Sequence, residues 1–218
     1  MGMENASESQ EEKRPYHSRL RQRQAEETHA RILAAARELL TSKGYANTTL
    51  QMIAEAADVS PKTVSAVFGS KHGILAALVN PSAFDAPVQR LFDELRATQE
   101  PSQRVALVVS ITRQVYESLA SQLELLRTAG VVAPELADLA REVELRRRHN
   151  QSYLIAYLQE QRVLCSDLSS EEATDVLWML TSYDLYRMLV VERGWPAERY
   201  ESWLTDLLIK LLIQPVDE

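Results

Sequence analysis

The stretch that decides the fold is residues 31–79, RILAAARELLTSKGYANTTLQMIAEAADVSPKTVSAVFGSKHGILAALV. Its apolar residues recur at three- and four-residue steps, which is the spacing of one face of an α-helix. Turn-forming residues interrupt these runs at Gly44, at Asp58 and at Gly69. The stretch therefore predicts short helices joined by tight turns.

Cap chemistry places the first two helices. We expect the first helix to run from about Thr28 and to end at Gly44, in the position after the last turn that favours glycine. Thr48 and Gln51 have the spacing of a capping box, in which each side chain satisfies a backbone N–H group of the first turn. The second helix is therefore expected to start at Thr48.

The third and fourth helices have equally clear starts. Ser60 is expected to cap the third helix, with Pro61 at the first helical position, where its missing N–H costs nothing. Ser70 is expected to cap the fourth. The third helix is brief, and the residues expected on its inward face are Val64, Val67 and Phe68.

The second and third helices, joined by a turn of three or four residues, fit a helix-turn-helix, whose second helix enters the major groove of DNA. Threonines at a helix start and a lysine at the start of the fourth helix suit phosphate groups. Short polar side chains on the third helix suit base edges. The candidate DNA-binding residues are Thr48, Thr49, Lys62, Thr63, Ser65 and Lys71. A plain bundle of capped helices has the same local pattern.

The rest of the chain also has helical periodicity, and the fold class is predicted to be all-α. A second capping box is expected at Ser169 and Glu172. Three domains are predicted: a flexible N-terminal arm (1–22), a helix-turn-helix domain (23–79) and a larger helical body (80–218). The helices expected in the body span residues 88–98, 102–120, 122–128, 134–163, 170–192 and 197–213.

Charge differs between these parts. Residues 13–79 contain ten Lys and Arg against five Asp and Glu, whereas residues 80–218 contain fourteen against twenty-two. A basic segment joined to an acidic body is typical of a protein that binds a polyanion. A solvated surface explains a bias of this size equally well.

Composition excludes several classes of protein. The 218 residues include one cysteine, Cys165, and no run of 18 apolar residues, so we expect a cytoplasmic protein without a disulfide framework or a membrane span. The sequence lacks GxSxG, HExxH, CxxC and glycine-rich phosphate-loop motifs, and its four histidines are scattered. It therefore predicts no enzyme, no catalytic or metal site and no cofactor.

Residues 31–79 resemble the DNA-binding domain of the TetR family of transcriptional regulators. The shared features run in order without a gap, from the Ile32, Ala36 and Leu40 spacing to Ser70-Lys71. The resemblance implies that the partner is double-stranded operator DNA. It also carries over phosphate contacts to Thr49 and Lys71, and base contacts to Lys62, Thr63 and Ser65.

The chain departs from the family pattern at two positions of the third helix. Family members usually have a tyrosine, which touches the DNA backbone, where this chain has Ser65. They usually have a glycine where this chain has Lys62. The resemblance therefore implies an operator unlike those of well-known relatives.

In the body, the resemblance is limited to length, helicity and a long pair of final helices. Those helices are apolar around much of their circumference, which indicates burial on two sides. The resemblance implies that they form a homodimer interface, and a monomeric core is the alternative.

The resemblance further implies a cavity in the body for an unidentified small-molecule effector. The candidate ligand-binding residues are polar or aromatic residues at inward positions: Thr112, Tyr116, His149, Tyr153, Trp178, Tyr183 and Arg187. Each also fits a core residue with its polar tip satisfied.

The function predicted from the sequence is a homodimeric transcriptional regulator, in the form of a repressor released from DNA by its ligand. The alternative is a helical protein–protein interaction module whose DNA-binding head has drifted, as the serine at position 65 would permit.

Overall fold

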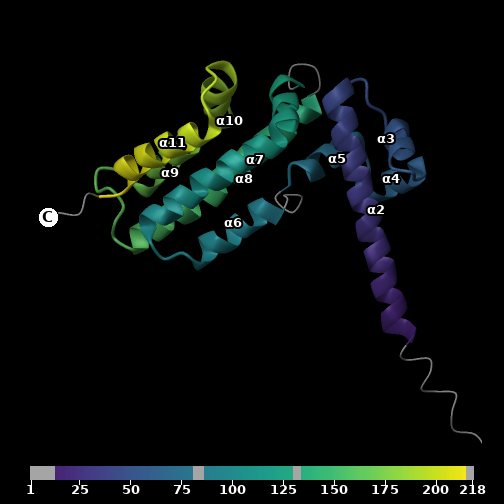
Figure 1. The fold of residues 1–218 in the computed structure, drawn as a ribbon, viewed down its shortest axis with the longest axis horizontal. Helices are drawn as coiled ribbons and strands as arrows, with labels where there is room; N and C mark the ends of the chain where they lie inside the picture. Colours follow the sequence, from purple (N-terminus) through teal and green to yellow (C-terminus); the bar gives the residue numbers. More distant parts are fainter. Residues whose placement is uncertain (1–12, 81–85, 130–133, 215–218) are drawn as a thin grey trace, which may run out of the picture. The chain divides into compact units, whose positions relative to one another are not determined.

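The computed structural model describes residues 13–80, 86–129 and 134–214, and the chain divides into two compact units, unit 1 (Met1–Leu78) and unit 2 (Val79–Glu218). Helices make up almost all of the regular structure in both (Figure 1). The described residues add one isolated antiparallel bridge between Leu164 and Ile213. The predicted all-α fold class is confirmed. No helix in the described ranges combines the length and the hydrophobicity needed to cross a bilayer.

Unit 1 is a small helical domain in which α2 packs on both α3 and α5, and α3 packs on α4. Its core is formed by apolar side chains such as Ile32, Ile53 and Leu75, all fully buried. The helices in the described part of this unit are α2 (Lys13–Lys43), α3 (Leu50–Ala56), α4 (Pro61–Phe68) and α5 (Lys71–Leu78).

Helix α2 starts at Lys13, well before the expected start at Thr28. Residues 13–22 of the expected flexible arm are therefore helical, while residues 1–12 lie outside the described part of the chain. The physical reason is composition: residues 13–27 contain four Arg, two Gln and two Glu, which favour helix, and Pro15 lies in the first turn. Pairs four residues apart, such as Gln22 with Glu26, add support.

Several predicted caps in unit 1 are confirmed. Gly44 follows α2 with φ +76°, a conformation that L side chains rarely adopt. Ser60 caps α4 by accepting a hydrogen bond from the Thr63 backbone N–H, with Pro61 at the first helical position. Ser70 Oγ accepts from the Gly73 N–H at the start of α5, at 3.1 Å.

Unit 2 is built around the helices α7 and α8, which pack against each other (Figure 1). Helix α6 and helix α11 pack on α7, and α9 packs on α8. Its elements are α6 (Ala86–Ala97), α7 (Pro101–Ala129), α8 (Pro134–Glu160), α9 (Ser170–Leu180), α10 (Tyr183–Tyr186), the π-helix η2 (Arg187–Glu192) and α11 (Ala197–Leu212).

Two predictions for the body are wrong in detail. The helices expected at 102–120 and 122–128 are one continuous helix, α7. The helix expected at 170–192 is interrupted at Thr181-Ser182, because Ser182 caps a new helix by accepting from the Leu185 N–H at 3.3 Å. The capping box at Ser169 and Glu172 is confirmed.

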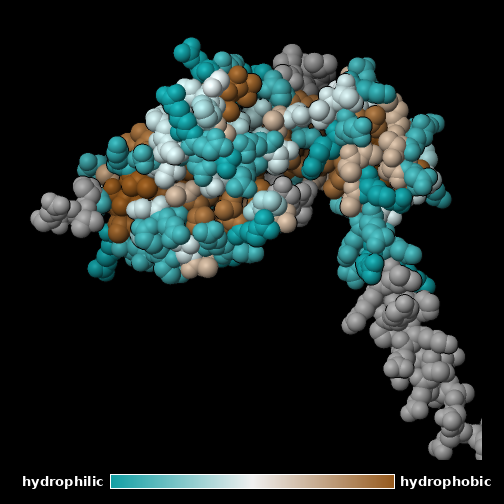
Figure 2. Space-filling view, in the orientation of Figure 1, coloured by the Kyte–Doolittle hydropathy of each residue, from teal (hydrophilic) through white to brown (hydrophobic). Residues whose placement is uncertain are grey.

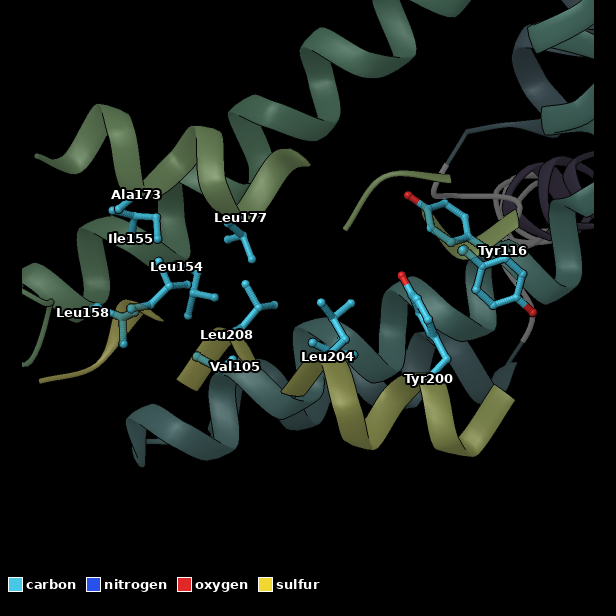
Figure 3. Close-up of a cluster of buried hydrophobic side chains, with 13 residues drawn as sticks. Val105, Tyr116, Leu154, Ile155, Leu158, Ala173, Leu177, Tyr200, Leu204 and Leu208 are labelled. Atoms are coloured by element: carbon cyan, nitrogen blue, oxygen red, sulfur yellow. The ribbon is translucent and has the colours of Figure 1, made fainter. Parts of the chain in front are cut away.

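The core of unit 2 lies where α11 meets α7, α8 and α9. Figure 3 shows Leu204 and Leu208 of α11 pointing into the same interior as Leu177 of α9, and all three are fully buried. The buried residues of α11 (Tyr200, Leu204, Leu208 and Leu212) recur every four residues and so form one stripe. This stripe packs into the core of unit 2, so the opposite face of α11 points away from the core.

Candidate DNA-binding surface and ligand cavity

Helices α3 and α4 form a helix-turn-helix. Residues 57–60 make the turn, in which Asp58 has φ +51° and the Val59 N–H donates to the Ala54 carbonyl at 3.0 Å. Aspartate tolerates this left-handed conformation better than most residues. Ile53 and Val64, one from each helix, are fully buried and join the pair.

The outward face of α4 carries Lys62, Ser65 and Ala66, all exposed. Val67 was expected to face inward, but its side chain is 45% exposed. The reason is that Val64 and Phe68, four residues apart, already define the inward stripe of this short helix. Phe68 stacks on His29 of α2, with ring centroids 4.7 Å apart, and so holds the end of α4.

The two threonines before α3 have different roles. Thr48 is fully buried, and its hydroxyl donates to the carbonyl oxygens of Gly44 and Leu39 at 2.8 and 3.2 Å. Thr49 is exposed and is the true N-cap of α3, accepting from the Met52 N–H at 3.2 Å. The predicted capping box from Thr48 is wrong, and the side chain of Gln51 pairs with Glu55 instead.

Lys71 holds the loop between α2 and α3. Its ammonium donates to the carbonyl oxygens of Tyr45 and Thr48, the latter at 2.8 Å, and lies 4.1 Å from the centroid of the Tyr45 ring. These contacts, over more than twenty residues of sequence, position the N-terminus of α3. The Lys71 ammonium could contact a DNA phosphate, as predicted, only while it also keeps these two hydrogen bonds and the contact with the Tyr45 ring.

Thr63 is half-buried, and its hydroxyl lies 2.8 Å from the Ser60 hydroxyl. The six predicted DNA-binding residues are thus separated into two sets. Thr49, Lys62 and Ser65 are exposed on the helix-turn-helix. Thr48, Thr63 and Lys71 are engaged within unit 1, so the structure gives Thr48 in particular an architectural role.

Unit 2 contains two adjoining cavities. The first, which we call the apolar cavity, has a volume of about 250 Å³ and a mostly apolar wall from α6, α7 and α8, including Phe92, Ile111 and Leu119. The second, the Trp178 cavity, has a volume of about 390 Å³ and lies among α7, α8, α9 and the start of α10. A mostly apolar hollow with a few polar groups is typical of a small-molecule site.

The candidate ligand-binding residues lie in three places. Four line the apolar cavity: Thr112, Tyr116, Tyr153 and Tyr183. Trp178 lines the neighbouring cavity.

The two remaining candidates, His149 and Arg187, line neither cavity. His149 is exposed, with its Nε2 atom 3.1 Å from the Tyr153 hydroxyl. Arg187, the first residue of η2, forms ion pairs with Asp184 of α10 and with Glu192 at the end of η2, while its Nε is buried without a hydrogen-bond partner among the described residues. Local periodicity could not show these contacts.

The structure adds a polar cluster that sequence analysis missed, which we call the Thr181 cluster: Thr181, Tyr116, Arg147 and Gln151. The Tyr116 hydroxyl donates to the Thr181 carbonyl at 2.5 Å. Arg147 Nη1 donates to the Thr181 hydroxyl at 3.0 Å, and Gln151 Nε2 donates to the same oxygen at 2.5 Å. The run Arg146-Arg147-Arg148 was the available signal for Arg147, but a run of this kind is most often a solvated helix face.

Burial governs the chemistry of this cluster. Removal from water raises the pKa of Tyr116 well above its ordinary value, and the nearby Arg147 guanidinium opposes that shift. Tyr116 is therefore a neutral hydrogen-bond donor at physiological pH. Arg147 in turn is held by Glu144, whose carboxylate also accepts from the Trp178 indole N–H at 2.9 Å.

The helix-turn-helix in unit 1 places this chain in the helix-turn-helix class of proteins. Residues 32–78 match the family model for bacterial regulatory proteins of the tetR family. This match covers 47 of the 218 residues, and it shows that unit 1 is similar to the DNA-binding domain of transcriptional regulators of this family.

Individual relatives support this assignment. The HTH-type transcriptional regulator YvkB of Bacillus subtilis is 47% identical over 53 residues, a match that covers 24% of this chain and 28% of that protein. Two solved structures are similar over the fold. One is a transcriptional regulator from Saccharomonospora viridis in complex with choline (TM-score 0.64, 22% identity, 87% of this chain and 100% of the other). The other is NalD, the secondary repressor of the MexAB-OprM multidrug efflux pump in Pseudomonas aeruginosa (TM-score 0.68, 21% identity, 88% and 98%).

Proposed function

We propose that this protein is a homodimeric repressor of transcription that binds operator DNA through unit 1 and is released by a small molecule bound in unit 2. The observation that carries the proposal is the helix-turn-helix with Lys62 and Ser65 exposed on α4 and Thr49 exposed at the start of α3. A short, small-residue surface lets a helix approach the base edges of the major groove. Such a protein works in the cytoplasm, where bacterial DNA lies.

An operator with two half-sites requires two DNA-binding heads related by a twofold axis. Apolar side chains exposed on unit 2 offer the surface for such a dimer: Met179 on α9 is 57% exposed, Val191 on η2 is 63% exposed and Leu211 on α11 is 39% exposed. Figure 2 shows hydrophobic surface over the α10–η2 segment and α11. We therefore assign the dimer interface to α9 and α11, with η2 beside them.

Ligand response is supported by the Thr181 cluster. Side chains that line the apolar cavity, Tyr116 and Gln151, also hold the break between α9 and α10. A ligand that shifts these side chains would move an end of a dimer helix. DNA and ligand would then weaken each other's binding by the same factor, as linkage requires.

Fluorescence anisotropy on DNA from upstream of the protein's own gene, at several salt concentrations, tests the proposal. Specific binding should exceed binding to scrambled DNA, and its logarithm should fall with log salt at a slope of roughly −0.9 per neutralised phosphate. Lys62→Ala should weaken it, whereas Lys43→Ala, on the last turn of α2, is the matched control.

Failure to bind any fragment of a genomic library would contradict DNA binding. The interaction module with a drifted head would then be the better explanation. The exposed Val67 on α4 would be its first candidate contact.

A further inference from the structure

Three arginines line the apolar cavity, and a carboxylate balances only one of them. Glu144 is the one acidic side chain among the described lining residues. Its Oε2 atom accepts from Arg147 Nη2 at 2.7 Å and from the Trp178 indole N–H at 2.9 Å. The other two lining arginines, Arg104 and Arg146, therefore give the cavity wall an excess of positive charge.

Two of the three guanidinium groups are engaged by the protein itself. Beyond its ion pair, Arg147 donates through Nη1 to the Thr181 hydroxyl at 3.0 Å. Arg104 lies 4.0 Å from the centroid of the Tyr157 ring and donates through Nη1 to the Thr98 carbonyl at 3.0 Å. A ligand would have to displace these contacts, so neither group is well placed to receive one.

Arg146 has donors to spare. Its one hydrogen bond in the described part of the chain runs from Nη2 to the Val79 carbonyl at 3.5 Å, which is longer than the usual range. Val79 also lines the cavity, so this contact places the guanidinium at the cavity wall. The Arg146 side chain is half-buried, yet the buried polar atoms that lack a partner do not include its Nε or Nη1. These two atoms are therefore accessible and can donate to a ligand.

A second donor lies beside Arg146. Asn150 follows it by one turn on the same face of α8, lines the cavity and is exposed. Side chains four residues apart on a helix are neighbours, with Cβ atoms about 5–6 Å apart. A guanidinium and an amide in this arrangement offer several N–H groups to the two oxygens of one carboxylate.

The shape of the cavity constrains the rest of the ligand. On α8 its lining residues run from Val143 to Leu154, which is about 16 Å of helix at the α-helical rise. A volume of about 250 Å³ over this length is a narrow channel and not a rounded hollow. Its wall on α7 includes the apolar side chains of Val108, Ile111 and Val115. The channel therefore suits an elongated apolar body.

We propose that the apolar cavity binds an elongated, mostly apolar molecule that ends in a carboxylate, and that Arg146 holds this carboxylate with Asn150 beside it. The inference rests on the proposed function, because it names the chemistry of the effector. A planar guanidinium matches the two oxygens of a carboxylate with parallel hydrogen bonds. An uncharged ligand would leave the Arg146 charge unbalanced in an apolar wall, and a cation would add to the excess of positive charge.

Three probes of similar chain length test the proposal by isothermal titration calorimetry on the full chain, without DNA. They are octanoate, which is anionic, 1-octanol, which is uncharged, and octyltrimethylammonium, which is cationic. We expect octanoate to bind at least roughly tenfold more tightly than either of the others, because hydrogen bonds between charged groups are worth this factor or more.

Two variants locate the preference. Arg146→Met removes the charge and keeps an unbranched side chain, so it should abolish the preference for octanoate and leave the affinity for 1-octanol within about twofold. Arg148→Met is the matched control, because Arg148 lines neither cavity and pairs with Asp175 at 2.7 Å, and it should keep the preference. If Arg146→Met fails to fold, the three probes on the unaltered chain still decide.

The proposal is overturned if 1-octanol or octyltrimethylammonium binds as tightly as octanoate, if the preference survives Arg146→Met, or if octanoate does not bind. DNA binding measured by anisotropy on the same preparation separates this result from the proposed function. Intact DNA binding with no preference for octanoate would refute only the ligand class.

Discussion

Thr181 and Gln151 are thirty residues apart, yet the Gln151 amide donates to the Thr181 hydroxyl at the point where α9 ends. The same hydroxyl accepts from Arg147 and donates to the Leu177 carbonyl. One buried oxygen atom therefore joins the wall of the apolar cavity to the break between α9 and α10. These hydrogen bonds hold Thr181, the C-cap residue of α9, in place, directly before the Ser182 cap that starts α10.

Replacing Thr181 by valine should destabilise the protein by about 1–3 kcal/mol, since it leaves the Gln151 amide without this acceptor in a buried site. Arg147 loses one hydrogen bond but keeps the Trp178 and Thr181 carbonyls as acceptors. Urea unfolding measures the change. Thr174→Val is the matched control, because Thr174 is also buried but its hydroxyl donates within its own helix to the Ser170 carbonyl. Equal losses in the two variants would contradict the clamping role of Thr181.

Lys71→Met should lower stability by about 1–3 kcal/mol and also weaken DNA binding. The substitution removes charge-assisted hydrogen bonds to the Tyr45 and Thr48 carbonyls, and with them the support for the start of α3. Lys62→Met, on the exposed face of α4, should weaken DNA binding with a change in stability within about 0.5 kcal/mol. Thermal unfolding and anisotropy together check the contrast, which fails if Lys71→Met leaves the melting temperature unchanged.

Met179→Glu should shift the protein from dimer to monomer in size-exclusion chromatography with light scattering. A charge placed in the centre of an apolar interface loses its hydration without a partner. Val67→Glu makes the same change at an exposed apolar residue of unit 1 and should leave the dimer intact while it impairs DNA binding. A dimer that tolerates the glutamate at position 179 would place the interface elsewhere.

Stability should decline as the pH rises above 10.0, the ordinary pKa of tyrosine. Burial raises the pKa of Tyr116 in the folded state, so above the ordinary value the unfolded chain loses a proton that the folded chain keeps. The loss approaches roughly 1.4 kcal/mol per pH unit for one such tyrosine. Urea midpoints in a series of alkaline buffers should therefore depend less on pH in Tyr116→Phe. Tyr153→Phe, at a side chain that is 63% exposed, should keep the slope of the unaltered chain.

Much of unit 1 could be predicted because its signals are local. The helix starts are set by Ser60, Pro61 and Ser70, which act on backbone groups within three residues of themselves. The end of α2 is set by Gly44, which adopts a positive φ angle that other residues rarely adopt. The same logic failed at Thr48, where two adjacent threonines both fit an N-cap. In the folded structure the Thr48 hydroxyl donates to the Leu39 and Gly44 carbonyls, and Thr49 is therefore the residue that caps α3.

The cavity was harder to predict. Aromatic residues at inward positions identified Tyr116 and Tyr183, since a helical stripe shows which side chains face the interior, whereas Tyr153 lines the cavity but is 63% exposed. The same reasoning included Arg187, which lines neither cavity and forms its ion pairs with the nearby Asp184 and Glu192. Helical periodicity of apolar and aromatic residues gave no reason to select Gln151, because a glutamine does not contribute to that pattern.

The sequence by itself determined the all-α fold and the helix-turn-helix, because both depend on hydrogen bonds and apolar spacing within a few residues along the chain. The tertiary structure alone decided that Lys71 supports a loop, that α9 ends at Thr181 and that Gln151 donates to the Thr181 hydroxyl. These properties arise when side chains from distant segments meet in a buried place. There each polar atom must find a partner, and the partner's position is not encoded in local spacing.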